Sequence, residues 1–343
     1  MNTQRFNLQS FILLLQQFTS LGLFILIVLI FGSLSDRFLT WQNFENILIQ
    51  SSSLGIIAIG MTFVLLTAGI DLSIGSIMFL SAVIAGKLVL AGYPLFLAIA
   101  AILLIGPLYG MVNALFITRL RMIPFIVTLA TLYLGRGLGY WISETRAMNL
   151  PENFTRIGSA RLLDVLPFPI LIFTIVLLLA HFILSRTAFG RQVYAIGYDV
   201  EAAKKAGIPT ERILFTVYII SGLCAAVGGL VSVAQGGSVA PSFGEEREFA
   251  AISAAVLGGT SLFGGRGNAF PGTVLGAILI QTIDNGLVII NANPYVYPLV
   301  TSAIIFIAVL LDSRLSAWLV SLKRKKIRVE QDGAHLFDIQ SSR

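Results

Sequence analysis

Long apolar runs recur along the whole chain and restrict its fold more than any other feature. A helix needs about 20 mostly apolar residues, at ~1.5 Å each, to cross roughly 30 Å of hydrocarbon. The runs are continuous, whereas barrel strands alternate over about ten residues, so helices are favoured. We expect an all-α, polytopic integral membrane protein with about ten transmembrane helices, some of them short or broken. The candidate spans are 18–34, 47–67, 74–92, 94–118, 123–143, 168–185, 213–235, a short 249–263, 270–291 and 295–312.

The composition agrees with this class. Hydrophobic residues make up 56% of the chain and charged residues only 12%, where soluble domains have about a quarter. A signal peptide does not explain the apolar character, because the runs continue to the end and only Arg5 precedes the first one. We therefore treat residues 1–343 as a single transmembrane domain surrounded by lipid, with no nucleic-acid partner.

The distribution of Lys and Arg predicts the orientation, because short cytoplasmic loops retain basic residues. With ten spans both termini lie on one side, and the basic tail at 313–343 places that side in the cytoplasm. The same choice leaves few basic residues outside: Arg37, Arg146, Arg156, Arg161 and Arg247. The inside segments then contain Arg5, Arg119, Arg121, Arg186, Arg191, Lys204, Lys205, Arg212, Arg266 and Arg314.

A charged segment between the sixth and seventh spans, 186–212, is therefore expected in the cytoplasm. Its "EAAKKAG" stretch predicts a short helix outside the folded core, with Glu201 four residues before Lys205 and Gly207 at the C′ position. Such a helix is either a solvated loop element or a docking surface for a cytoplasmic partner.

Four blocks of sequence carry a family resemblance. The stretches "AIGMTFVLLTAGIDLSIGS", "IPFIVTLATLYLGRG", "RTAFGRQVYAIGYDVEAAKKAGI" and "FAAISAAVLGGTSLFGGRGNAFPGTVLGAILI" resemble the transmembrane permeases of ribose-type ABC sugar importers. The likeness runs in order from about residue 44 to Asp312. It implies a bacterial inner-membrane permease, two copies of which form a sugar pathway, with a cytoplasmic ABC ATPase and an extracytoplasmic sugar-binding protein as partners.

The resemblance also implies a role for the charged segment, which corresponds to the coupling helix that contacts the ATPase. The residues expected to carry this contact are Asp199, Glu201, Ala202, Ala203 and Gly207. The chain departs from the family pattern at Tyr198-Asp199, where a Gly-Asn pair is frequent, and at Asp284, where an uncharged amide is frequent. The departures concern the detail of the coupling contact and of the pathway.

ATP hydrolysis is not expected in this chain. No G-x-x-x-x-G-K-[ST] stretch occurs, so any ATPase is a separate polypeptide that uses ATP and Mg²⁺. The sequence also has no paired-histidine motif and no nucleophile elbow, which disfavours an enzyme. We expect no cofactor, no metal and no catalytic residue here.

Polar residues inside or between the spans are the candidates for the pathway. Gln281, Asp284 and Asn285 lie on one stretch of the ninth span, at spacings that place them on a shared helix face. Asp71 and Ser73 lie between the second and third spans. They either cap the following helix or face the pathway at a break in a discontinuous helix.

Two other functions fit part of the pattern. An ion-coupled secondary sugar carrier would use buried carboxylates, for which Asp284 and Asp71 are the candidates, but it needs no cytoplasmic coupling helix. A receptor or channel would need no ATPase. The sequence does not identify the sugar, nor does it say whether the two permease copies are identical.

The charge distribution yields a topology prediction. In a Cys224-free background, cysteines replacing Lys204 or Lys325 should react with a membrane-impermeant thiol reagent only after the membrane is opened. Cysteines within 144–167 or 236–248 should react in intact cells. Labelling of position 204 or 325 from outside would contradict the predicted orientation.

Overall fold

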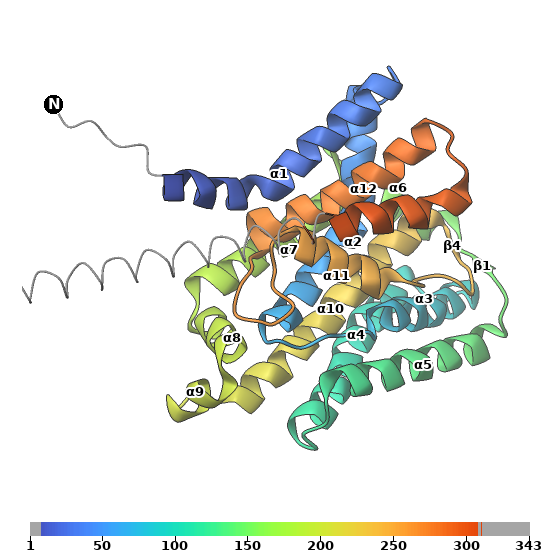
Figure 1. Ribbon diagram of the computed structural model, residues 1–343. Coiled ribbons are helices and arrows are strands. Elements are labelled where there is room, and N and C mark those ends of the chain that lie inside the picture. The colour runs from blue at the N-terminus through green and yellow to red at the C-terminus, as the bar shows by residue number, and fades with distance from the viewer. Residues whose placement is uncertain (1–7, 308–309, 311–343) are drawn as a thin grey trace, which may run out of the picture.

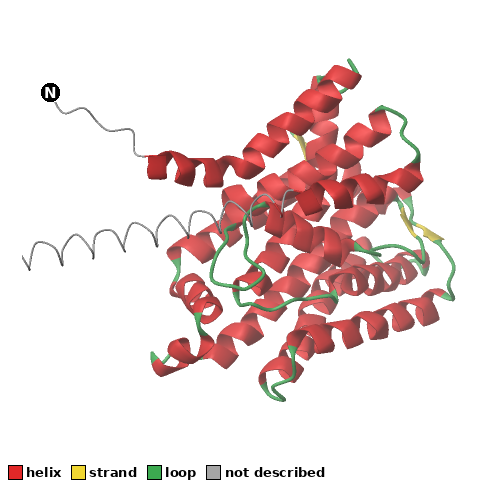
Figure 2. Cartoon of the chain, viewed as in Figure 1, coloured by secondary structure: helices red, strands yellow, loops and turns green. Residues whose placement is uncertain are grey.

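The computed structural model describes residues 8–307 and 310, and helices dominate it (Figures 1 and 2). Six helical segments are long and apolar enough to cross a membrane. They are α2 (Trp41–Leu66), α4 (Leu95–Thr118), α5 (Pro124–Ser143), α7 (Phe168–Arg186), α10 (Thr210–Gly236) and Ala269–Ile289, which joins the π-helical turn η1 (Ala269–Thr273) to α12 (Val274–Ile289).

Shorter apolar helices accompany these six. They are the apolar part of α1 (Leu8–Leu34), α3 (Ile74–Leu90) and the Pro294–Ile307 helix, which begins with the 3-10 turn η2 (Pro294–Val296). The predicted all-α, polytopic membrane fold with some short helices is confirmed. The predicted tail at 313–343, Arg5 and the end of the tenth span lie outside the described residues.

The eighth predicted span is wrong in its extent. Helix α11 (Arg247–Leu257) has 11 residues, and it ends six residues before the predicted boundary. At ~1.5 Å per residue such a helix is only about 16 Å long, too short to cross the hydrocarbon layer by itself. The chain leaves the helix at Gly258 and Gly259, and Gly259 has a φ of +89°. A loop, 258–268, then leads to η1.

Helix α2 occupies the centre of the bundle. Every residue from Ser51 to Leu66 is buried, and α2 contacts α7, α10, α11 and α12. A helix that is apolar all round is stable only where other helices surround it. Two of its buried polar side chains bond to other elements: Ser53 Oγ donates to Gly228 O at 2.8 Å, and Thr62 Oγ1 lies 2.7 Å from Thr273 Oγ1.

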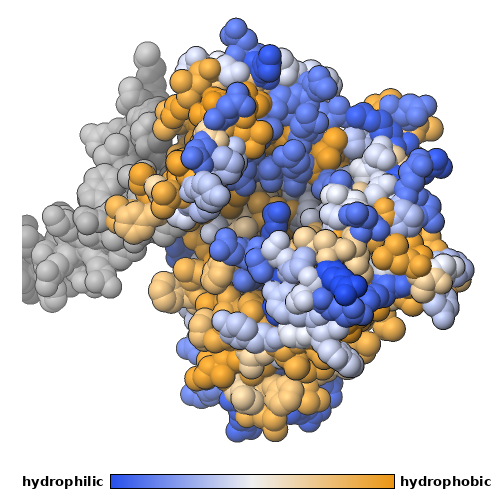
Figure 3. All heavy atoms as spheres, turned by 90° about the vertical axis from the view of Figure 1, so that its right-hand side faces the viewer, coloured by the Kyte–Doolittle hydropathy of each residue, from blue (hydrophilic) through white to orange (hydrophobic). Residues whose placement is uncertain are grey.

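One end of the bundle carries small elements that the sequence did not predict. Strand β1 (Met148–Asn149) pairs antiparallel with β4 (Ser238–Val239), and β2 (Arg161–Leu162) pairs with β3 (Leu166–Pro167). The face at this end is hydrophilic over much of its middle, with hydrophobic residues towards its edges (Figure 3). Because β1 and β4 belong to the two longest loops predicted outside, those loops do share one end of the molecule.

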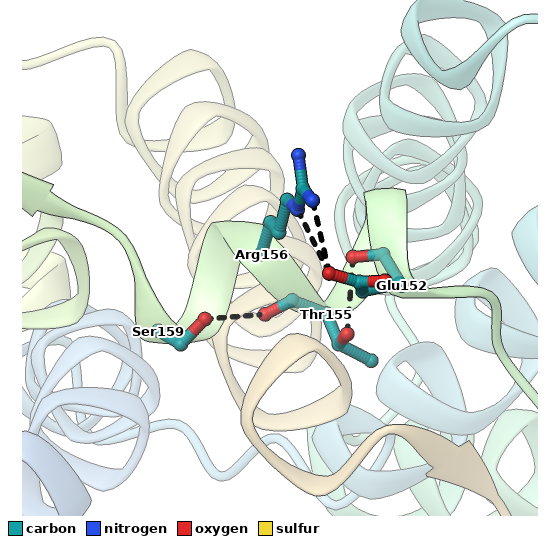
Figure 4. Close-up of polar contacts among 4 residues, drawn as sticks. All are labelled: Glu152, Thr155, Arg156 and Ser159. Atoms are coloured by element: carbon teal, nitrogen blue, oxygen red, sulfur yellow. Dashed lines mark hydrogen bonds and ion pairs between the residues drawn. The ribbon is translucent and has the colours of Figure 1, made fainter.

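Helix α6 (Glu152–Ser159) lies at the same end and packs against α10. Its Phe154 is fully buried, whereas its outer face carries an ion pair in which Arg156 Nη2 lies 3.0 Å from Glu152 Oε1 (Figure 4). Ser159 Oγ donates to Thr155 O on the same helix. Exposed pairs of this kind contribute at most about 1 kcal/mol, so the buried phenylalanine is the stronger anchor.

The charged segment lies at the opposite end (Figure 1). It forms two helices, α8 (Ala188–Tyr198) and α9 (Val200–Lys205), where the sequence predicted one. This segment lies far from β1 and β4 (Figure 1). The separation agrees with the prediction that the segment and the loops that hold these strands lie on different sides of the membrane. Which end faces the cytoplasm stays a prediction.

A buried arginine ties α5 to the loop that precedes α11. Arg136 Nη1 donates to Phe243 O at 2.7 Å, and its guanidinium lies 5.1 Å from the centroid of the Phe79 ring. Arg136 is buried, so its charged group is held by a backbone carbonyl of a distant loop.

Candidate functional site

A cavity of about 660 Å³ opens between α11, α12 and the Pro294–Ile307 helix, with one residue from α2. Two aromatic side chains, Phe249 and Tyr297, lie on its wall. The polar residues of the wall come from four helical segments and the turn before α11. They are Gln50, Glu246, Ser253, Gln281, Asp284, Asn285, Thr301 and Ser302.

The three polar residues predicted on the ninth span all line this cavity. Gln281 Nε2 donates to Gln50 Oε1 at 2.9 Å, and Thr301 Oγ1 donates to Asp284 Oδ1 at 3.2 Å. Asn285 is buried, and its Oδ1 has no hydrogen-bond partner among the described residues. The cavity therefore presents two carboxylates, of Glu246 and Asp284, and three side-chain amides, of Gln50, Gln281 and Asn285, to whatever enters it.

Sequence reasoning missed the opposite wall. Gln50, Ser253 and Thr301 are far from α12 in the chain, and no spacing relates them to it. Gln50 was detectable in principle, as a large polar residue inside an apolar run. Ser253 and Thr301 give no such signal, because small hydroxyl residues are common at helix contacts in membranes.

Asp71 lies in a separate place, at the centre of a buried hydrogen-bond network. Its Oδ1 accepts from Ser73 N at 3.0 Å and from Ser73 Oγ at 2.6 Å, and its Oδ2 accepts from Ser221 Oγ at 2.7 Å. Asn113 Nδ2 donates to Ser73 Oγ at 2.8 Å, and Thr131 Oγ1 donates to Asn113 Oδ1 at 2.7 Å. The network thereby links α3, α4, α5 and α10.

The hydrogen bonds of Asp71 and Ser73 connect helices to one another. Ser73 occupies the N-cap position of α3, but its side chain makes no cap bond there, and Asp71 accepts the Ser73 N–H instead. Both side chains are fully buried, and neither lines the cavity that holds Asp284. The assignment of these two residues to the pathway stays a prediction.

The charged segment is held by strong local capping. Asp199 Oδ1 accepts from the N–H groups of Glu201 and Ala202 at 2.9 and 3.0 Å, which starts α9. At the other end Gly207 has a φ of +81°, and its N–H donates to Lys204 O. Ile208 N donates to Ala203 O, which completes a Schellman motif and confirms Gly207 at C′.

Two details of this segment differ from the sequence prediction. Glu201 Oε1 lies 2.8 Å from Lys204 Nζ, so the glutamate pairs at i+3 with Lys204 and not, as expected, at i+4 with Lys205. Ala203 is only 4% exposed and packs within an apolar cluster that includes Ile196 and Ile213. The expectation that the whole segment lies outside the core is therefore wrong at Ala203, whereas Glu201 and Ala202 are exposed.

A family model matches most of the chain. The model describes the "Branched-chain amino acid transport system / permease component", and it covers residues 43–310. The chain belongs to this family. The match includes both the cavity and the α8–α9 segment, and it identifies the protein as a membrane transport permease.

Individual relatives are similar over nearly their whole length. The permease is 36% identical to the ribose import permease protein RbsC of Haemophilus influenzae, over 92% of its own chain and 98% of the relative. It is 37% identical to the D-allose transport system permease protein AlsC of Escherichia coli, over 90% and 94%. The fructose import permease protein FrcC of Rhizobium meliloti is 37% identical over 81% and 80%. No solved structure matches the permease.

The Asp71 network predicts a loss of stability when its acceptor is removed. Asp71→Leu should lower the free energy of unfolding of the purified permease by about 2–5 kcal/mol, since each buried donor left unpaired costs about 1–3 kcal/mol. Titration with a denaturing detergent, followed by circular dichroism, measures this change. Asp36→Leu, at an exposed aspartate, is the matched control and should unfold like the parent. An unchanged midpoint for Asp71→Leu would show that the network does not hold these helices together.

Proposed function

We propose that this permease is the membrane subunit of an ATP-driven importer for a monosaccharide or a related sugar. The main observation in support of this proposal is the composition of the cavity wall. Gln281, Asp284 and Asn285 lie there opposite hydroxyl residues of neighbouring helices. Three similar permeases are named for ribose, allose and fructose, all of them monosaccharides. The sugar specificity of the relatives and the chemistry of the cavity support the same substrate class.

A sugar suits this cavity for physical reasons. Each hydroxyl group both donates and accepts, so it can bond to the carboxylate of Asp284 and to the side-chain amides of the wall. Phe249 and Tyr297 offer apolar surface for the C–H faces of a sugar ring. The volume of about 660 Å³ lies within the range of roughly 300–1,000 Å³ for small-molecule sites.

The two ends of the molecule differ, and this difference supports the proposal that each end binds a different partner protein. The exposed part of α9, with Glu201 and Ala202, is the proposed contact for a cytoplasmic ABC ATPase, which would bind the ATP and Mg²⁺. The end that carries α6, β1 and β4 is the proposed docking side for an extracytoplasmic sugar-binding protein. Two permease copies in the bacterial inner membrane, with both termini in the cytoplasm, would enclose the pathway.

Reconstitution tests this function against the ion-coupled carrier. Proteoliposomes that contain the permease, its ATPase and its binding protein should take up labelled ribose, allose or fructose only with ATP. An ionophore that collapses proton and sodium gradients should leave this uptake unchanged. Uptake that needs a gradient and continues without ATP would refute the proposal and favour the carrier.

The cavity wall generates a mutational prediction. Asp284→Asn retains an acceptor for Thr301 and should reduce ATP-driven uptake modestly, without making it depend on pH. Asp284→Leu removes the polar group and should reduce uptake about tenfold or more, which corresponds to the loss of ~1.4 kcal/mol or more of interaction.

The control for this pair is Thr282→Val, on the same helix but away from the cavity, compared at equal amounts of inserted protein. Full uptake by Asp284→Leu would mean that this residue serves packing rather than the pathway. Loss of gradient-driven accumulation in Asp284→Asn would instead mean that the residue carries a coupling proton.

The coupling segment generates a second prediction, which separates its exposed from its buried residues. Glu201→Arg reverses an exposed charge, so it should lower sugar-stimulated ATP hydrolysis while the permease still folds. Ala203→Leu overpacks a buried position and should lower thermal stability, since overpacking costs about 1–3 kcal/mol.

Thermal stability is measured on the detergent-solubilised permease, and sugar-stimulated ATP hydrolysis is measured on the assembled transporter. The exposed change Glu152→Arg, at the opposite end of the molecule, should leave both the thermal stability and the ATP hydrolysis measured without sugar and binding protein unchanged. Wild-type sugar stimulation in Glu201→Arg would remove the coupling role from this residue.

A further inference from the structure

Helix α8 is bonded to the loop that connects α11 to α12. Tyr194 Oη, on α8, donates to Gly267 O at 2.8 Å. The same loop is bonded to the end of α2, because Gly265 N donates to Leu66 O at 3.0 Å. The loop 258–268 therefore lies between the charged segment and the central helix and touches both.

The contact beside this hydrogen bond is made by backbone alone. A Cβ on Gly197 would overlap the carbonyl oxygen of Leu66 and the amide nitrogen of Gly265. From the other side, a Cβ on Gly264 would lie 2.6 Å from Gly197 O. No flexible side chain separates α8 from the loop at this point. Because close-packed interiors have low compressibility, such a contact passes a displacement on instead of absorbing it.

The loop leads directly into both walls of the cavity. Behind it is α11, which carries Ser253, and ahead of it is α12, which carries Gln281 and Asp284. The forward junction is fixed by Asn268, whose Oδ1 accepts from Gly272 N at 2.7 Å in η1. A shift of the loop thus moves the ends of two helices that line the cavity.

We propose that Gly197 and Tyr194 are positioning residues that carry a displacement of α8 and α9 through loop 258–268 to the cavity walls. The inference rests on the proposed function, since it needs an ATPase that moves the α8–α9 end. It assigns a route for that movement which bypasses α10, although α10 follows α9 directly in the chain. Neither residue contacts the substrate, and both act through the loop.

The number of sugar molecules taken up per ATP hydrolysed tests this route. A purely structural defect lowers uptake and hydrolysis together and leaves the ratio unchanged, whereas a broken route lowers the ratio. Gly197→Ala forces α8 away from Leu66 and from the loop, because the new methyl group has no room there, and should lower the ratio about fivefold or more. Tyr194→Phe removes the hydrogen bond to Gly267 O without adding volume and should lower the ratio several-fold.

Matched controls come from α5. Gly137→Ala adds the same methyl group where nothing lies within 4 Å, and Tyr133→Phe removes a hydroxyl from an exposed tyrosine. Both should keep the ratio of the parent. If Gly197→Ala fails to assemble with the ATPase, Tyr194→Phe decides the question by itself.

The outcomes separate the two proposals. Parent uptake that is independent of ATP would refute the proposed function before the route is tested. ATP-dependent parent uptake, combined with an unchanged ratio in Gly197→Ala and Tyr194→Phe, would refute only the route. An equal fall of uptake and hydrolysis in both variants would reduce the two residues to packing and would also refute it.

Discussion

A carboxylate buried among apolar helices is tolerable only when several donors surround it, and the Asp71 network meets this condition. The donors that reach Asp71 come from Ser73 and Ser221, and the chain of bonds continues through Asn113 to Thr131. A buried polar group without a hydrogen-bond partner is so unfavourable that these helices keep their relative positions. The network therefore fixes α3, α4, α5 and α10 as one frame around the central α2.

The cavity lies among other elements, because its wall comes from α11, α12, the Pro294–Ile307 helix and Gln50 of α2. Among the described residues, no side-chain hydrogen bond joins the Asp71 network to α11 or to the Pro294–Ile307 helix. Those helices meet α2 and α12 through apolar packing and a few single bonds, such as Thr301 to Asp284. Helices that meet through apolar packing can slide past one another by small shear movements, whereas a buried network would lose hydrogen bonds. Transport requires the wall of the pathway to change its exposure. Helices that meet through apolar packing suit such a wall better than helices held by a buried hydrogen-bond network.

Much of this organisation was predictable from local sequence. The apolar runs gave nearly all the long helices, because length and hydropathy decide whether a helix can span a membrane. Spacing alone placed Gln281, Asp284 and Asn285 on one face, and Gly207 at a helix end. These features depend on neighbours within a turn or two of the same helix.

The remainder depends on contacts between distant segments. The early end of α11, the strand pairs at β1–β4 and β2–β3, and the burial of Ala203 have no periodic signal. Asp71 shows the limit most clearly: its sequence context fitted both a cap and a pathway residue, and only Ser221, 150 positions away, reveals the network. The backbone contact at Gly197 was equally hidden, because glycine is abundant in this chain and most glycines look alike in sequence.

The claim that the α12 cavity is the sugar pathway can be tested by its access to water. Cysteines are placed at Gln281, on the cavity wall, and at Ile283, which is fully buried in the core, in a Cys224→Ser permease assembled with its partners. We predict that a water-soluble thiol reagent modifies position 281, that the transported sugar slows this reaction, and that position 283 stays unmodified. An unreactive position 281, or a rate that the sugar does not change, would contradict the assignment of the pathway to this cavity.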